Sequence, residues 1–168
     1  MENENTDSMA TKPIEEHKWL DHLVGEWTYT VEMNMGPDEP MQKGTGTESV
    51  KSLGGLWAFA ENHSSMPDGT PTVSYSALGY DVSFKEYRGC WFATMSSHLW
   101  KQEGELSADG KTMTLNCTGP SMTKDGETAQ YRDVIEITDR DNRVTTSYGE
   151  DDDGKFQVFM VSKYQRAK

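Results

Sequence analysis

The residues best suited to bind a charged ligand lie near the end of the chain. Tyr164 and Arg166 are separated by one residue, so both side chains fall on one face of an extended strand, together with Met160. An arginine fork binds a carboxylate through two parallel hydrogen bonds. The spacing therefore predicts an anchor for an amphipathic anion. In the alternative, Arg166 lies at the rim or in the C-terminal tail and Tyr164 packs in the core.

Arg132 is a second candidate for ligand binding. It shares a strand face with Glu136, while the opposite face is more apolar and carries Tyr131, Asp133, Ile135 and Ile137. This pattern favours an outward orientation for Arg132 and Glu136. If they point inward instead, each must neutralise the other or meet a ligand, because a buried unpaired charge is costly.

Aromatic residues on two further segments are candidates for a pocket lining. Trp57, Glu61 and His63 share one face of a predicted strand, and Trp91 lies in the middle of another. Ligand cavities are mostly apolar with a few polar anchors. The pattern thus predicts a pocket, although plain core packing produces the same pattern.

The motifs of common catalytic and metal sites are missing. His17 and His22 do not share a helix face, and the acidic run that begins at Glu150 lacks the calcium-loop spacing. No Gly-x-Ser-x-Gly and no phosphate-binding glycine loop is present. We predict no metal and no cofactor, assign no catalytic residue, and lean against an enzyme.

Composition restricts the partners. The 168 residues carry a net charge of −12, which disfavours nucleic acids and anionic membranes. The N-terminus lacks the basic and apolar regions of a secretory signal, so we expect a cytoplasmic protein. We expect a disordered leader over 1–11 and a single domain over 12–168. Cys90 and Cys117 fall on strands too far apart for a disulfide.

The hydrophobic pattern predicts one short helix followed by ten strands. Pro13 fits a first helical turn, and Gly25 can adopt the left-handed conformation that ends a helix. From Trp27 the period changes to two, with Tyr29, Val31, Met33 and Met35 on the same face. The predicted helix spans 13–24, and the strands span about 27–35, 42–53, 56–63, 72–81, 86–95, 99–107, 112–119, 128–138, 143–149 and 156–165.

Short turns between the strands favour antiparallel neighbours. A sheet of ten such strands removes its edges by closing into an up-and-down barrel. We therefore predict an all-β fold, with the helix covering one end and Trp27 filling the floor. A barrel of this size has room inside for side chains and one small ligand.

Several motifs resemble those of a known family. The entry Leu23-Val24-Gly25-Glu26-Trp27 is similar to the Gly-x-Trp start of calycins, the lipocalin and fatty-acid-binding barrels. More of the chain resembles a lipocalin-like family of bacterial proteins known as a domain of unknown function. The matching pieces are Leu53 to Trp57, Leu78 to Asp81, Trp91, the stretch Arg132 to Glu136, and Phe156 to Arg166.

The resemblance implies the barrel fold but supplies no reaction. Fatty-acid-binding proteins hold a carboxylate with an arginine and a tyrosine two apart on the final strand, in the reverse order to Tyr164 and Arg166. We therefore predict a barrel that binds a small apolar or amphipathic ligand, with a carboxylate as one option. The alternatives are a filled barrel that serves as an interaction or oligomerisation module, including a homodimer, or a barrel enzyme with inward Glu, His or Arg.

Overall fold

The computed structural model describes residues 10–34, 36 and 38–168. Residues 1–9 of the predicted leader and Met35 lie outside this described part. None of the helices within it is long and apolar enough to cross a membrane.

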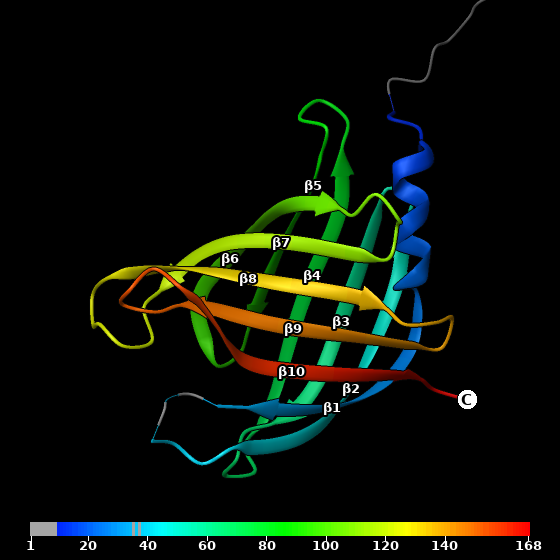
Figure 1. Ribbon diagram of the computed structural model, residues 1–168. Coiled ribbons are helices and arrows are strands. Elements are labelled where there is room, and N and C mark those ends of the chain that lie inside the picture. Colours follow the sequence, from blue (N-terminus) through cyan, green and yellow to red (C-terminus); the bar gives the residue numbers. More distant parts are fainter. Residues whose placement is uncertain (1–9, 35, 37) are drawn as a thin grey trace, which may run out of the picture.

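Ten antiparallel strands form a closed barrel in which each strand pairs with its neighbours in sequence and β1 pairs with β10. The predicted all-β, up-and-down architecture is confirmed (Figure 1). The strands are β1 (Gly25–Met33), β2 (Gln42–Leu53), β3 (Trp57–Ser65), β4 (Pro71–Asp81), β5 (Glu86–Ala93), β6 (Ser96–Leu106), β7 (Thr112–Pro120), β8 (Thr128–Ile137), β9 (Asn142–Glu150) and β10 (Phe156–Arg166).

Among the described residues, one 3₁₀ helix, η1 (Glu15–His22), precedes β1. It is shorter than the predicted span of 13–24 and covers one end of the barrel (Figure 1). Gly25 has a φ of 134°, a conformation that favours glycine, and this turn admits Trp27 directly beneath the helix. Trp27 is 2% exposed, and its indole Nε1 donates a hydrogen bond to the Leu23 carbonyl at 2.8 Å.

Side chains alternate between the interior and the outer surface along each strand, with one change of phase in β10. The pairing of β10 with β9 shifts between Val158 and Met160, as expected of a β-bulge. Beyond the bulge, Met160, Ser162 and Tyr164 occupy inward positions. Before it, Val158 is half exposed on the outside. The bulge thus decides which side chains of the last strand reach the interior.

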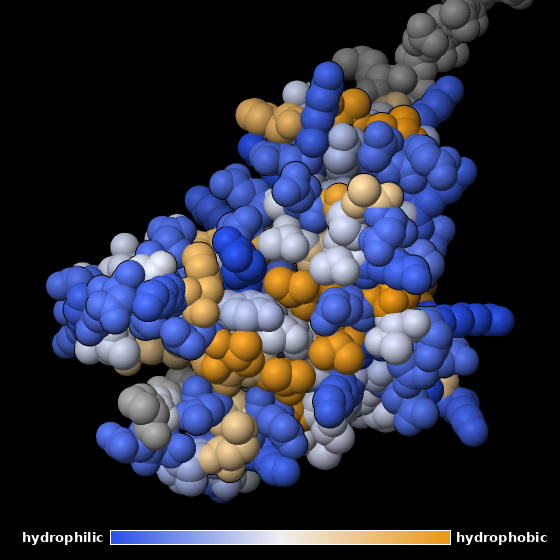
Figure 2. Space-filling model, in the orientation of Figure 1, coloured by the Kyte–Doolittle hydropathy of each residue, from blue (hydrophilic) through white to orange (hydrophobic). Residues whose placement is uncertain are grey.

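The outer surface carries both apolar and hydrophilic side chains. Figure 2 shows apolar side chains in the middle of the face that β8, β9 and β10 present, surrounded by hydrophilic residues. The outward positions of these strands include Val134, Val144, Val158 and Val161.

Candidate ligand-binding site

The half of the interior beneath η1 holds the packed core, and several inward side chains of the opposite half keep some accessible surface. The packed half contains Met113, which is 0% exposed, with Leu115 and Tyr87 at 3% each. In the other half, inward side chains keep partly accessible surface; these are Tyr29, Trp91, Trp100, Gln102, Asp133, Met160 and Tyr164. We define this opposite half, with these residues as its lining, as the chamber.

Aromatic rings form a belt around one side of the chamber. Trp100 meets the rings of His98 and Tyr131 edge to face, at centroid distances of 4.9 and 5.0 Å. Tyr131 in turn contacts Phe159 at 6.2 Å, and Trp91 pairs with Trp100 across β5 and β6. Such edge-to-face contacts favour fixed ring orientations. The belt therefore offers a rigid aromatic wall.

Asp133 lies on the inward face of β8, next to this belt. Gln102 Nε2 donates to one carboxylate oxygen at 2.8 Å, and Ser147 Oγ donates to the other at 2.5 Å. No ion pair of Asp133 is found within the described residues. The carboxylate is therefore oriented by two neutral donors and has no counter-charge.

Burial and neighbouring charge shift the pKa values of Asp133 and Cys117. Burial raises the pKa of Asp133, while the hydrogen bonds from Ser147 and Gln102 oppose the shift. Burial, with a smaller contribution from the charge of Asp133, raises the pKa of Cys117 to about 12. The Cys117 thiol is therefore protonated at neutral pH and is a poor nucleophile, because the thiolate is the reactive form.

A buried ion pair lies between the chamber and the floor. Arg143 of β9 pairs with Glu48 of β2, and their side chains are 5% and 7% exposed. The guanidinium carbon also lies 3.9 Å from the ring centroid of Tyr164 and 4.7 Å from that of Trp27. Burial lowers the pKa of Arg143 to about 10, so the side chain stays charged at neutral pH. The charge of Arg143 is already neutralised by Glu48.

Arg166 joins the last strand to the end of η1. It stacks over Trp27 at 4.2 Å and donates to the Val24 carbonyl at 2.6 Å, with further donation to the carbonyls of His22 and Arg140. The structure thus places Arg166 at the closed end, with its fork occupied by backbone oxygens. Tyr164, two residues before, faces the chamber on the other side of Arg143.

The eight residues predicted to bind ligand fall into three groups. Trp91, Met160 and Tyr164 line the chamber, and Arg166 binds the helix end. The other four lie on the outer surface. Glu61 and His63 pair with each other there at 2.6 Å, Trp57 is 40% exposed, and Arg132 Nε donates to Asn116 at 3.0 Å.

The outward position of Trp57, Glu61 and His63 has a packing cause. Ala58 and Ala60 occupy the inward positions of β3 at 4% and 5% exposure, where the floor is already filled by large side chains. Trp57 instead lies over Gly79 of β4, on the outside, where a Cβ would meet its ring. Arg132 follows the outward orientation that the more apolar opposite face of β8 favours, and Glu136 is exposed.

Asp133, Gln102 and Trp100 line the chamber but are not among the residues predicted from the sequence to bind ligand. A signal for Asp133 was present, because it interrupts the apolar face of β8 that Tyr131, Ile135 and Ile137 share. Gln102 and Trp100 lie on the same face of β6, but nothing in that segment distinguishes them from core residues.

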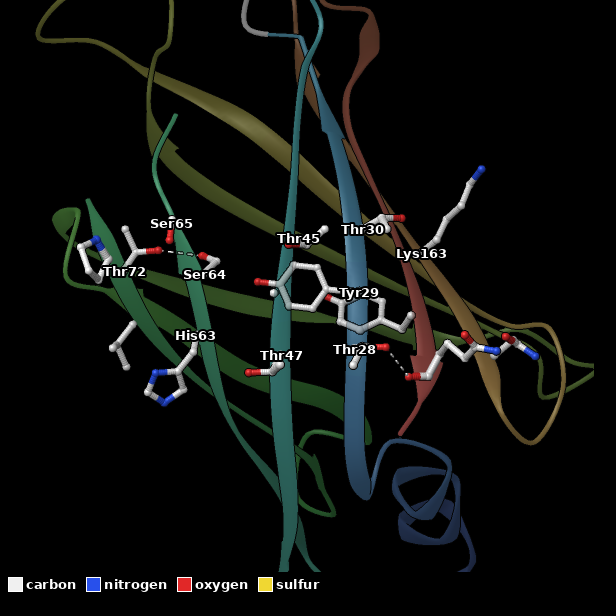
Figure 3. Close-up of a pocket in the computed structure, with 16 residues that line it drawn as sticks. Thr28, Tyr29, Thr30, Thr45, Thr47, His63, Ser64, Ser65, Thr72 and Lys163 are labelled. Carbon is white, nitrogen blue, oxygen red and sulfur yellow. Dashed lines mark hydrogen bonds between the residues drawn. The ribbon is translucent and has the colours of Figure 1, made fainter. Parts of the chain in front are cut away.

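A hollow lies along β10, β1, β2, β3 and β4 (Figure 3), and its lining includes Tyr29 and Tyr164 of the chamber. It has a volume of about 880 Å³ and is lined largely by hydroxyl and amide side chains, among them Thr28, Thr30, Thr45 and Thr47. His63 and Lys163 border it. Small-molecule sites usually bury most of their ligand, whereas the threonines here are exposed. The chamber is therefore the better candidate for the ligand-binding site.

No group of three or more His, Cys, Asp and Glu side chains able to hold a metal ion is found among the residues described. The two cysteines are free, and Cys90 lies on the outward side of β5.

Similar structures support the barrel fold. The protein Rv2717c from M. tuberculosis matches with a TM-score of 0.65 and 13% identity, over 92% of this chain and 99% of that one. The S-type phycobiliprotein lyase CPES from Guillardia theta matches with a TM-score of 0.56 and 12% identity, over 92% and 94%. At these identities the likeness concerns the fold alone.

No curated protein matches the sequence. A family described as "Protein of unknown function (DUF1579)" matches residues 12–166, which is nearly the whole barrel with its helix. The chain therefore belongs to the DUF1579 family and has a lipocalin-like, calycin-type barrel.

Proposed function

We propose that the barrel binds a small amphipathic molecule whose head group carries a positive charge or a strong hydrogen-bond donor. The head group contacts Asp133, and the apolar body lies along the aromatic belt of Trp91, Trp100, Tyr131 and Phe159. One observation carries this proposal: Asp133 is an inward, largely buried carboxylate that keeps some accessible surface and has no ion-pair partner among the described residues.

The charges inside the barrel favour a cationic or donor-rich head group over an anionic one. A buried carboxylate is unfavourable until an opposite charge or further donors reach it. The charges of the two arginines at inward positions are both compensated: Arg143 pairs with Glu48, although its Nε has no hydrogen-bond partner among the described residues, and Arg166 pairs with Asp141 and donates to backbone carbonyls. An anionic ligand would therefore meet an uncompensated negative charge and no free cation. This argues against the fatty-acid type of carboxylate binding and for an amine or another donor-rich head group.

We infer that ligand enters at the end opposite η1, because the helix covers the other end (Figure 1). Five loops lie at that end, and four of them carry an exposed methionine: Met41 between β1 and β2, Met66 between β3 and β4, Met95 between β5 and β6, and Met122 between β7 and β8. The fifth loop, between β9 and β10, is acidic, with Asp151, Asp152 and Asp153. Methionine is flexible and adapts to varied apolar partners. These side chains suit contact with an apolar tail as it enters.

A matched pair of probes tests the proposal. One is a fatty-acid analogue with a dansyl group at its far end, and the other replaces its carboxylate with an amine. We expect the amine probe to bind at least about tenfold more tightly, a difference of about 1.4 kcal/mol. Asp133→Asn should remove this preference. Asp21→Asn, the same change on the exposed surface of η1, should preserve it.

Dansyl fluorescence and isothermal titration provide the readout at neutral pH. Equal binding of both probes, or tighter binding of the carboxylate, would contradict the proposed head-group chemistry. An amine preference that survives Asp133→Asn would show that another group recognises the ligand.

A further inference from the structure

The outer surface of β3, β4 and β5 carries a stack of aromatic rings. Phe59 lies 5.8 Å from Tyr75, and Tyr75 lies 5.7 Å from Phe92, with interplanar angles of 23° and 29°. Phe59 is 40% exposed and Phe92 is 43% exposed. We call these three residues the aromatic ladder.

Large apolar side chains extend the ladder at both ends. Trp57 follows Phe59 on the outer face of β3 at 40% exposure, and Leu99 on β6 is 46% exposed. Ala77 and Cys90 face each other beside the ladder, and their small side chains leave room for incoming rings. By contrast, the adjacent strands β1 and β2 present Thr28, Thr30, Thr45 and Thr47 outward.

We propose that a second copy of this chain docks on the aromatic ladder to form a symmetric homodimer. The two-fold axis lies in the interface and passes near Tyr75. Tyr75 of one copy then meets Tyr75 of the other, and Phe59 of each copy meets Phe92 of its partner. The interface uses the outside of the barrel and does not depend on the proposed ligand.

The order of the rings is what favours a second copy. A two-fold interface brings the same patch together from both subunits, so the patch must be complementary to itself. The ladder meets this requirement because Phe59 and Phe92 flank Tyr75 at nearly equal distances, 5.8 and 5.7 Å. A half turn about an axis through Tyr75 exchanges two chemically identical side chains.

The charges around the ladder also permit self-association. The chain has a net charge of −12, so most of its surface repels another copy. Lys51, Arg88 and Lys101 lie at outward positions beside the ladder, against Glu61 and Glu103. Arg88 also pairs with Glu86 and Asp81 on the same face. The cations beside the ladder therefore offset part of the negative charge there, which lowers the repulsion between two acidic copies.

The exposed apolar area suits a dimer of moderate affinity. At about 40% of roughly 200 Å² each, Trp57, Phe59, Phe92 and Leu99 provide about 300 Å² per copy, and the less exposed Tyr75 adds a smaller area. A standard interface buries about 800 Å² per partner, somewhat more than half of it apolar. The ladder supplies most of that apolar share, and we expect dissociation on the order of micromolar.

Sedimentation velocity across a concentration series tests the proposal. The wild-type chain should change from monomer to dimer as its concentration rises from about 1 to about 200 μM. Phe92→Lys should weaken this dimer at least about tenfold, since it places a charge opposite Phe59. Val158→Lys is the matched control, because Val158 is equally exposed but lies on β10.

A wild-type chain that stays monomeric at the highest concentration would overturn the proposal without any variant. So would a dimer that Val158→Lys dissociates as strongly as Phe92→Lys does. Circular dichroism melting confirms that each variant is folded before it is compared.

Crosslinking tests the position of the axis. In a Cys90→Ser background, Tyr75→Cys should form an intermolecular disulfide rapidly under mild oxidation, because the two substituted residues face each other across the axis. Val158→Cys in the same background should crosslink no faster than random collision allows. Equal rates for the two variants would place the axis elsewhere.

Discussion

The Trp100 ring in the chamber wall packs directly against Gly119. Gly119 lies on β7 behind the Trp100 ring, and a Cβ at this position would fall within 2.8 Å of three ring carbons. The nearest ring carbon would lie at 2.2 Å, whereas carbon atoms in contact prefer about 3.5–4.0 Å, so Gly119→Ala must move that part of the ring by about 1.3 Å. The backbone of Gly119 has no positive φ, so the effect comes from this overlap alone.

Overpacking of this kind costs about 1–3 kcal/mol. Displacement of Trp100 also disturbs its contacts with His98 and Tyr131. We expect Gly119→Ala to lower the free energy of unfolding by that amount in urea titrations and to shift the emission of Trp100. In a Trp100→Val background the ring is gone, and the same alanine should cost less than about 0.5 kcal/mol. An equal cost in both backgrounds would show that Gly119 is not needed to leave room for the Trp100 ring.

Three further predictions concern the charged groups. Arg143→Met should destabilise the fold by about 3–5 kcal/mol because it leaves Glu48 buried without a partner. Adding Glu48→Gln should recover at least about 2 kcal/mol of this loss in urea unfolding. A loss that stays unchanged in the double variant would contradict the pairing. For Asp133 the native pKa is raised, so the native state holds this proton more tightly than the unfolded chain. The stability of the wild type relative to Asp133→Asn should therefore be greatest below about pH 4 and should fall as pH rises through the native pKa; a difference that grows with pH would be incompatible with this burial. Arg166→Lys should cost about 1–3 kcal/mol in thermal or urea unfolding, since a lysine cannot both stack on Trp27 and donate as a fork, and a neutral result would remove Arg166 as the bond between β10 and η1.

Much of the fold follows from local chemistry. Glycines with positive φ occur at turns that the sequence marks, such as Gly110 and Gly126, and between them the period of two defines the strands. The sequence thus predicts ten strands and their antiparallel order. It overestimates the helix, because a segment this short does not reveal whether it will form α or 3₁₀ turns.

The candidate site is harder to predict, because a period of two defines two faces of a strand without telling which is inside. On β3 the aromatic face has the composition of a core, yet Ala58 and Ala60 face inward where the floor is crowded. On β10 the bulge after Val158 reverses the phase, and no residue type marks it. The partners of Arg166 and Asp133 are distant in sequence, so their roles depend on the closed barrel.

Ligand binding in the chamber can be followed by NMR of the five tryptophan indoles during titration with the amine probe. Trp91 and Trp100 line the chamber, Trp19 and Trp27 lie in the packed floor, and Trp57 lies outside. We predict that the indole signals of Trp91 and Trp100 move in proportion to occupancy while the other three stay within their noise. Movement of Trp57 alone, with Trp91 and Trp100 unchanged, would place the ligand on the outer surface and contradict the account.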